Sequence, residues 1–181
     1  RLLAARVRGK KATLGDALEK AAGVLSGVDP ERLGVVLSAQ HSNEDNFALL
    51  RLGRDYLGTG HIYVSGRAEG LGDQVLKHAD KNPNAAGVTA LCTSTPPKTF
   101  AELAKDIHDG RITHVIALGS YSSDATKTEA LGKLQGLVTL ATREGPVAKH
   151  ATVVLPVSSW AECDGTFVNA KGMAQESEKA I

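Results

Sequence analysis

The sequence predicts an α/β protein with a Rossmann-like parallel sheet that is covered by helices on both faces. Short apolar runs rich in β-branched residues alternate with segments of helical periodicity along most of the chain. The clearest strand is the run at residues 113–118, where successive apolar side chains point to alternate faces. Because both faces of this strand are apolar, both need helices over them, as in a parallel sheet.

The first part of the chain is predicted to form two helices separated by a strand. Apolar residues at helical spacing indicate a helix at residues 14–25, and Thr13 before it is a typical N-cap. Residues 35–38 form a short apolar strand. Ser42 then caps a second helix, which Gly58 and Gly60 end.

The middle of the chain is predicted to be less regular. Residues 62–64 favour a strand, and residues 75–79 favour one or two helical turns that Pro83 ends. Residues 88–91 form a short apolar run that we assign to a strand.

The second half returns to a regular alternation of helices and strands. Thr99 and Glu102 make a capping box, so a helix is predicted from there to Gly110. The remaining predicted elements are a strand at 113–118, a helix at 126–134, and strands at 137–142 and 152–155.

Length and charge favour a single domain and give no general sign of a nucleic-acid or membrane partner. The chain has 181 residues and a net charge of +1. It has no apolar run of about 18 residues, so no direct membrane insertion is expected. A basic run at the N-terminus comprises Arg1, Arg6, Arg8, Lys10 and Lys11. We expect this run to be a solvated arm, with contact to an acidic partner surface as the alternative.

The cysteine and histidine patterns predict no metal ligands within this chain. Cys92 and Cys163 are the two cysteines, whereas an iron–sulfur cluster of the common type needs four. Both are expected to be free thiols, with a disulfide between them left open. The six histidines have no metal-binding spacing. Glu162 and Asp164 flank Cys163, and a solvated turn is the expected structure there.

The C-terminal segment contains a long pattern with fixed gaps. Its residues are Ala151, Val153, Val154, Leu155, Pro156, Glu162, Gly165, Thr166, Phe167, Asn169, Gly172 and Gln175. This pattern resembles the end of the molybdopterin oxidoreductase domain, A-D-V-V-L-P … E … G-T-F-x-N-x-E-G-R-x-Q. Thr152 and Met173 depart from it, because that family usually has Asp and Arg at these positions.

Further similar segments extend the resemblance over nearly the whole chain. They lie at residues 12–18, 37–47, 80–88 and 103–119. Within the family, the chain most resembles the large iron–sulfur subunit of bacterial NADH–quinone oxidoreductase (respiratory complex I). Catalytic family members have a large α/β insert between the segments that match 37–64 and 80–119, whereas here only residues 65–79 intervene. The resemblance therefore implies a non-catalytic structural domain.

The same resemblance implies the setting of this domain. The parent polypeptide would begin before Arg1 and carry electrons from NADH towards quinone through iron–sulfur clusters outside this chain. Other subunits of a respiratory complex would be its partners, on the cytoplasmic side of the inner membrane, and the chain itself would hold no cofactor.

We expect three segments: a basic arm at 1–12, an α/β domain at 13–157 and an extension at 158–181. The extension has few large apolar residues after Phe167 and Val168, so order is expected to fade beyond Asn169. A regular closing helix at 174–180 is the alternative.

A ligand of this fold would bind in the loops at the carboxyl ends of the strands. Hydroxyl groups in the loop at 119–124 would suit a phosphate beside a helix N-terminus, although a polar turn capped by Ser123 or Asp124 is the simpler interpretation. The candidate ligand-binding residues are Gly119, Ser120, Ser122, Ser123, Gly165, Thr166 and Asn169.

Two other functions remain as alternatives. One is a fragment of a catalytic molybdopterin oxidoreductase, such as a formate dehydrogenase large subunit. The other is a free-standing nucleotide-binding domain of the Rossmann type, which the missing G-x-G-x-x-G fingerprint disfavours. No G-x-S-x-G elbow surrounds Ser158 or Ser159, so no catalytic residue is predicted.

Overall fold

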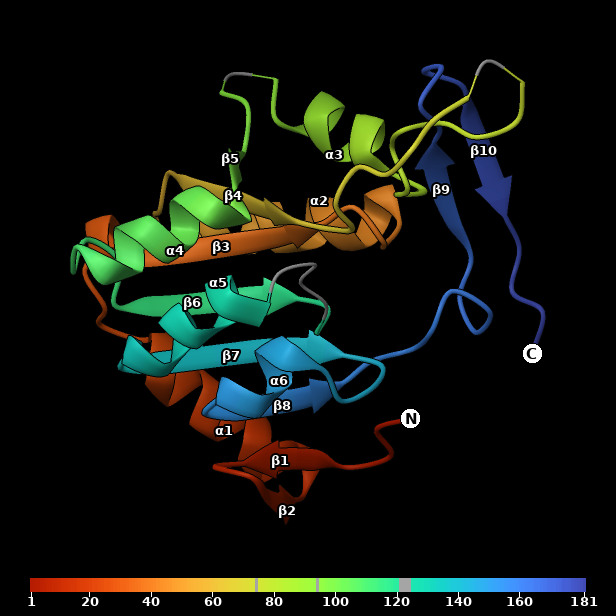
Figure 1. The fold of residues 1–181 in the computed structure, drawn as a ribbon. Coiled ribbons are helices and arrows are strands. Elements are labelled where there is room, and N and C mark those ends of the chain that lie inside the picture. Colours follow the sequence, from red (N-terminus) through yellow and green to blue (C-terminus); the bar gives the residue numbers. More distant parts are fainter. Residues whose placement is uncertain (74, 94, 121–124) are drawn as a thin grey trace.

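The computed structural model describes residues 1–73, 75–93, 95–120 and 125–181, and an eight-stranded sheet forms its centre (Figure 1). The strands of the sheet are β1 (Ala5–Val7), β2 (Lys10–Ala12), β3 (Leu33–Ser38), β4 (His61–Ser65), β5 (Lys98–Thr99), β6 (His114–Leu118), β7 (Gly136–Ala141) and β8 (Val153–Pro156). The α-helices are α1 (Leu14–Leu25), α2 (Asn43–Arg51), α3 (Ala85–Leu91), α4 (Phe100–His108), α5 (Ala125–Glu129) and α6 (Pro146–His150). Shorter helical turns are η1 (Pro30–Arg32), the π-helical η2 (Leu52–Tyr56) and η3 (Ala130–Lys133).

The order of the strands is β2-β1-β8-β7-β6-β3-β4-β5. The six strands from β8 to β5 in this order are parallel, while β1 and β2 add an antiparallel edge. From β3 the chain proceeds to β4 and β5, and it then returns to the other side of β3 to form β6, β7 and β8. The direction of winding therefore changes between β3 and β6.

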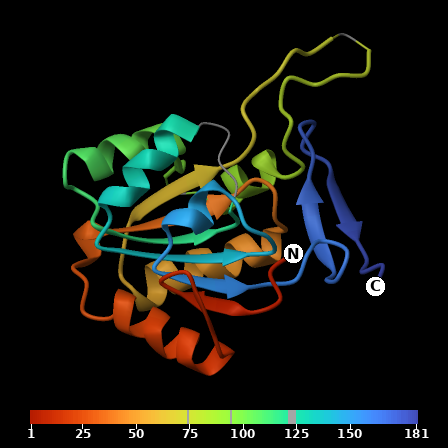
Figure 2. The same cartoon turned by 60° about the horizontal axis from the view of Figure 1, so that its bottom comes forward.

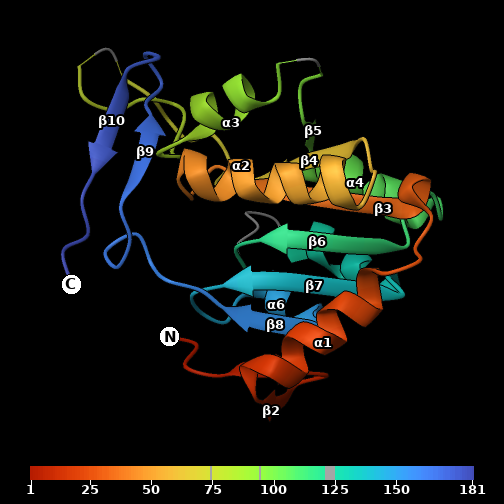
Figure 3. The same cartoon turned by 180° about the vertical axis from the view of Figure 1, so that it is seen from behind.

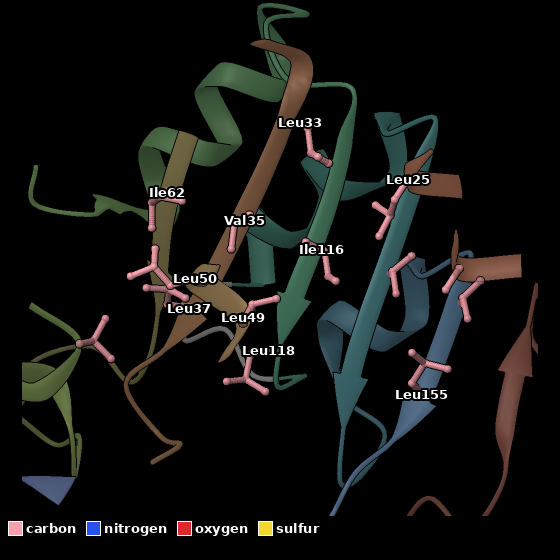
Figure 4. Close-up of a cluster of buried hydrophobic side chains, with 14 of the residues drawn as sticks. Leu25, Leu33, Val35, Leu37, Leu49, Leu50, Ile62, Ile116, Leu118 and Leu155 are labelled. Atoms are coloured by element: carbon pink, nitrogen blue, oxygen red, sulfur yellow. The ribbon is translucent and has the colours of Figure 1, made fainter. Parts of the chain in front are cut away.

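Helices cover both faces of the sheet, which confirms the predicted fold class. Helices α4, α5 and α6 lie on the face seen in Figure 1, and α1 and α2 lie on the face seen in Figure 3. The central strand β6 serves both cores. Ile116 and Leu118 pack with residues of α1 and α2 (Figure 4), whereas Val115 and Ala117 pack with residues of α4 and η3. This alternation is the pattern expected for residues 113–118.

The predicted helix caps are confirmed. The Thr13 hydroxyl accepts a hydrogen bond from the Asp16 N–H at 3.1 Å, and the Ser42 hydroxyl caps α2 in the same way. Thr99 and Glu102 form the full capping box of α4. These local signals depend on neighbouring residues alone, so they are readable without the tertiary structure.

The expectation of a solvated N-terminal arm is wrong. Strands β1 and β2 form a hairpin, and β1 pairs with β8, so this segment is the edge of the main sheet. Arg8 and Gly9 both have positive φ at the turn, and Leu2 and Ala5 are buried. Basic residues dominate the charge of this segment, but the apolar residues between them are the ones that pack on the sheet.

Two assignments in the middle of the chain are also wrong. The described residues between 75 and 79 form bends without a helix, because the Asp73 carboxylate turns the backbone there. The run at 88–91 belongs to α3 and is not a strand. Val88 and Cys92 are buried one helical turn apart, and a short apolar run does not distinguish this arrangement from a strand.

The C-terminal segment does not become irregular beyond Asn169, and the closing helix at 174–180 is absent too. Strands β9 (Gly165–Val168) and β10 (Ala174–Ser177) form a separate antiparallel hairpin beside the sheet (Figure 2). Gly172 has a φ of 78° in the connecting turn, where a residue with a side chain would be strained.

Candidate functional site

A cavity of about 590 Å³ lies at the carboxyl edge of the parallel strands. Ser38, Gly119, Thr142 and Ser158 line it, and each follows or ends a different strand, β3, β6, β7 or β8. Because β3 and β6 are the neighbours at which the winding changes direction, the cavity lies where doubly wound sheets bind their ligands.

A buried asparagine holds the loop between β3 and α2 in place. Asn46 is fully buried, and its side-chain oxygen accepts the Ser38 N–H at 2.8 Å. Its amide group donates to the carbonyls of Ser38 and Ser42 at 3.0 and 2.8 Å. These bonds satisfy the polar backbone of the turn, so the loop that lines the cavity is rigid.

His41 and Ser38 form a polar pair within this loop. The His41 Nδ1 atom lies 2.8 Å from the Ser38 Oγ atom. Burial lowers the pKa of His41 and outweighs the opposing attraction of the Asp45 carboxylate. The imidazole is therefore neutral at neutral pH, and in the tautomer with its proton on Nε2 the Nδ1 atom accepts a hydrogen bond from the Ser38 hydroxyl. The pair offers hydrogen bonds to a polar ligand without adding charge.

Two arginine residues, Arg67 and Arg143, line the cavity. Neither forms an ion pair within the described part of the chain. Of the carboxylates nearby, Glu144 pairs with Arg6, and Asp164 accepts the Lys179 N–H at 2.8 Å. The two arginines are consequently available for an anionic group.

The outer rim of the cavity is a turn that contains Trp160 and Cys163. The Glu162 carboxylate accepts the N–H and hydroxyl of Ser159 at 2.8 and 2.9 Å and also pairs with Arg1. These bonds close the turn expected at this position. The Cys163 thiol donates to the Ser159 carbonyl at 3.3 Å, and both cysteines of the chain are free thiols.

The β9–β10 hairpin closes one side of the cavity, where Gly165 and Phe167 line it. A Cβ atom on Gly165 would lie 2.6 Å from the Ser42 Cβ, so only glycine permits this approach. The Thr166 N–H donates to the Glu44 carboxylate, and the Val168 N–H donates to the Asn84 side chain, both at 2.8 Å. Side chains from α2 and from the start of α3 thus hold the hairpin.

The structure brings together part of the predicted ligand-binding set. Gly119, Ser120 and Gly165 line the cavity, whereas Ser122 and Ser123 lie outside the described residues. Thr166 and Asn169 are not among the lining residues. The Asn169 side chain instead accepts the N–H groups of Lys171 and Met173 at 2.9 and 3.1 Å, so it shapes the hairpin turn.

The lining residues that sequence reasoning missed include Ser38, His41, Arg67 and Arg143. Each lies at or just after the carboxyl end of a strand that the sequence did predict. Gly119 and Ser120 were predicted because ligands of such sheets bind in the loops at the carboxyl ends of the strands. The same reasoning, extended to the loops after β3, β4 and β7, would have identified these residues.

The molybdopterin cofactor of the family that the chain resembles can be compared with the residues around this cavity. Burial, together with carboxylates at Asp45, Asp164 and Glu162, raises the pKa of Cys163, so the free side chain is a thiol at neutral pH. Among the described residues, no three His, Cys, Asp or Glu side chains gather into a metal-binding group. The cavity volume suits one small ligand, not a pair of pterin dinucleotides.

Comparisons with known proteins agree with the C-terminal pattern. Among the described helices, none has the length and hydrophobicity required to span a membrane. In the search of curated proteins, no match to the chain was found. The family model described as molybdopterin oxidoreductase matches residues 35–181, a range that includes the change of winding, the cavity and the hairpin. The chain therefore belongs to the molybdopterin oxidoreductase family.

Proposed function

We propose that this chain is a non-catalytic structural domain of the large iron–sulfur subunit of a bacterial NADH–quinone oxidoreductase. The main support is the connection between β4, which ends at Ser65, and α3, which begins at Ala85. The described residues between them form loops and bends without a helix or strand. Catalytic members that the chain resembles have a large α/β insert at this place, and that insert supplies walls of the cofactor site.

The chemistry of the cavity supports the same proposal. A catalytic molybdenum site requires a metal ligand, and the Cys163 thiol instead donates a hydrogen bond to the Ser159 carbonyl. The residues of α2, α3 and the hairpin are occupied in holding one another. In this proposal the domain supplies bulk and subunit contacts, and electrons pass through iron–sulfur clusters elsewhere in the parent.

The experiment is purification of the intact parent through a tag, followed by metal analysis and activity assays. We expect iron without stoichiometric molybdenum, and NADH oxidation coupled to quinone reduction in the purified complex, recovered from the membrane fraction with its partner subunits. Stoichiometric molybdenum together with formate oxidation would overturn the proposal in favour of a formate dehydrogenase large subunit.

The isolated chain provides a second measurement. Because the described residues contain no metal-binding group, we expect the purified chain to contain no stoichiometric iron, molybdenum or flavin. Elemental analysis and an ultraviolet–visible spectrum measure this directly. A bound cofactor in the isolated chain would contradict a purely structural role.

A nucleotide- or phosphate-binding domain is the second candidate, because Arg67 and Arg143 line the cavity without ion-pair partners among the described residues. Guanidinium groups bind phosphate oxygens in bidentate geometry. Calorimetric titration with inorganic phosphate and with a nucleoside diphosphate tests this function. Binding that is lost in Arg143→Gln and kept in Lys20→Gln, a substitution on the exposed face of α1, would favour it.

A further inference from the structure

A second cavity adjoins the one described above, which we now call the polar cavity. The second cavity has a volume of about 750 Å³. Leu49 of α2 and Leu118 at the end of β6 line it, and both are buried in the core on the α1 and α2 side of the sheet (Figure 4). Most of its other lining residues are apolar too: Leu2, Leu3, Ala48, Leu52, Leu140, Pro156 and Val157. We call this second cavity the apolar trough.

The apolar trough and the polar cavity meet at a shared boundary, because His41, Asp45, Ser158 and Cys163 line both. Besides burial, the charges of Asp45 and Asp164 raise the pKa of Cys163, which places both carboxylates near this boundary. Within the described part of the chain, neither carboxylate forms an ion pair. The boundary therefore has negative charge that no side-chain cation neutralises, and this suits an ammonium group.

The polar cavity supplies the opposite charge. Arg67 and Arg143 line this cavity and not the trough, and neither has an ion-pair partner among the described residues. A guanidinium group binds a carboxylate through two parallel hydrogen bonds. The joined cavities thus offer arginines in one part, carboxylates at the boundary and apolar side chains in the other part.

This arrangement distinguishes between classes of ligand. A simple anion such as phosphate uses the arginines but leaves the carboxylates and the apolar trough unoccupied. An apolar amine uses the carboxylates and the trough but leaves the arginines unpaired. An amino acid with an apolar side chain carries a carboxylate, an ammonium group and an apolar group on one carbon atom, so it matches all three parts of the lining.

We propose that the polar cavity and the apolar trough together bind a free amino acid with a large apolar side chain. Its carboxylate binds Arg67 and Arg143, its ammonium group binds Asp45 at the boundary, and its side chain enters the trough. Because the trough is larger than a single side chain, it selects for apolar character and not for one shape. This role goes beyond the structural role proposed above and does not depend on the identity of the parent.

The first test is a calorimetric titration of the purified chain with four small molecules. L-phenylalanine has all three groups, phenylpropanoate lacks the ammonium group, phenylethylamine lacks the carboxylate, and glycine lacks the apolar side chain. We expect L-phenylalanine to bind at least about 10-fold more tightly than each of the others, because each lacks one matched contact. The fluorescence of Trp160, the single tryptophan of the chain and a lining residue of the polar cavity, gives an independent signal.

Variants assign the two charged contacts. Asp45→Asn should weaken the binding of L-phenylalanine by at least about 10-fold and leave that of phenylpropanoate unchanged, because phenylpropanoate has no ammonium group. The double variant Arg67→Gln, Arg143→Gln should weaken the binding of L-phenylalanine and leave that of phenylethylamine unchanged. The matched controls Glu19→Gln and Lys20→Gln, at exposed positions of α1, should bind like the unsubstituted chain.

Three results would overturn the proposal. The first is L-phenylalanine that binds no more tightly than glycine, and the second is an affinity for L-phenylalanine that Asp45→Asn and the double arginine variant leave unchanged. The third is binding of inorganic phosphate without binding of L-phenylalanine, which would favour the phosphate-binding function instead. The metal content and substrate use of the parent report separately on the proposed structural role.

Discussion

The parallel sheet and the β9–β10 hairpin are held in place by different forces. Between β3 and β6, apolar side chains fill both faces of the sheet, and Val35 and Ile116 lie side by side in one core. The hairpin instead depends on directional hydrogen bonds from its backbone to the side chains of Glu44 and Asn84. Apolar burial is non-directional and sums over many contacts, whereas two polar contacts fix a position without adding much stability.

This difference has a consequence for the cavity. Its floor belongs to the sheet, and one of its walls belongs to the hairpin, through Gly165 and Phe167. Substitutions in the sheet should therefore change global stability, while substitutions at Glu44 or Asn84 should mainly release the wall. Four predictions test this division, in order of decreasing effect.

The largest effect is expected for Ile116→Ala in the central strand. Ile116 is 4% exposed and packs in the core with α1 and α2, so its truncation should lower the free energy of unfolding by about 2–5 kcal/mol through transfer and cavity costs. Urea unfolding measures the change, with Leu18→Ala as the exposed control. A loss below about 1 kcal/mol would show that this strand is not central to the core.

Asn84→Ala should destabilise less and act mainly on the hairpin. Asn84 is fully buried, accepts the Val168 N–H, and donates to the His41 carbonyl at 2.8 Å. Its truncation leaves these groups without partners, at a cost of about 1–3 kcal/mol. We expect faster amide exchange at Val168 while β6 amides stay protected, with Gln135→Ala as the control outside the hairpin. Equal acceleration in both regions would contradict the division.

Glu44 should make the attachment of the hairpin sensitive to pH. Burial raises the pKa of Glu44, but hydrogen bonds from Thr166 and Ser42 together outweigh burial and lower it below its usual value near 4.5. A depressed carboxyl pKa stabilises the folded form above the unfolded pKa, and this contribution is lost as the pH falls through the folded pKa. Protection of the Thr166 amide, corrected for intrinsic exchange, should therefore fall on acidification below about pH 4.5.

The matched variants for this experiment are Glu44→Gln and Glu19→Gln. Glu44→Gln should show weak protection of the Thr166 amide at all pH values, and Glu19→Gln on α1 should behave like the unsubstituted chain. The pH range from 6 to 3 spans about 3 units around the usual pKa of a carboxyl group. If protection of the Thr166 amide against exchange stays constant over this range, Glu44 does not hold the hairpin.

The smallest effect is expected for His41. Burial lowers the pKa of His41 below 6.5, so the imidazole becomes protonated at a higher pH in the unfolded chain than in the folded chain. Stability should therefore decline slightly as the pH falls from about 6.5 through the folded pKa, and His41→Asn should remove that part of the decline. An NMR titration of the imidazole is the measurement, and a midpoint at or above 6.5 would contradict a buried neutral ring.

Much of the sheet was predictable because its signals are local. The strand at residues 113–118 and the caps at Thr13, Ser42 and Thr99 depend on neighbouring residues, and the structure contains all of them. The run at 88–91 was misassigned because four apolar residues are compatible with a strand and with one helical turn. Only the packing of Val88 against the sheet decides between them.

The candidate site was predictable in part. The rule that ligands bind at the carboxyl ends of strands identified Gly119 and Ser120, and the C-terminal pattern identified Gly165. Arg67 and Arg143 follow different strands, and nothing in their local sequence indicates that they share a cavity. That they line the same cavity follows from the order of the strands, which the sequence does not state.

The sequence by itself determined the alternation of strands and helices, the apolar faces of the central strands, and the C-terminal pattern of the molybdopterin oxidoreductase family. The tertiary structure decided what the first and last segments of the chain pack against. Thr166 and Glu44 are 122 residues apart, and the N-terminal strand β1 pairs with β8. The physical reason is that periodicity and capping act within a few residues, whereas a backbone N–H selects its partner by proximity in space, which only the folded chain establishes.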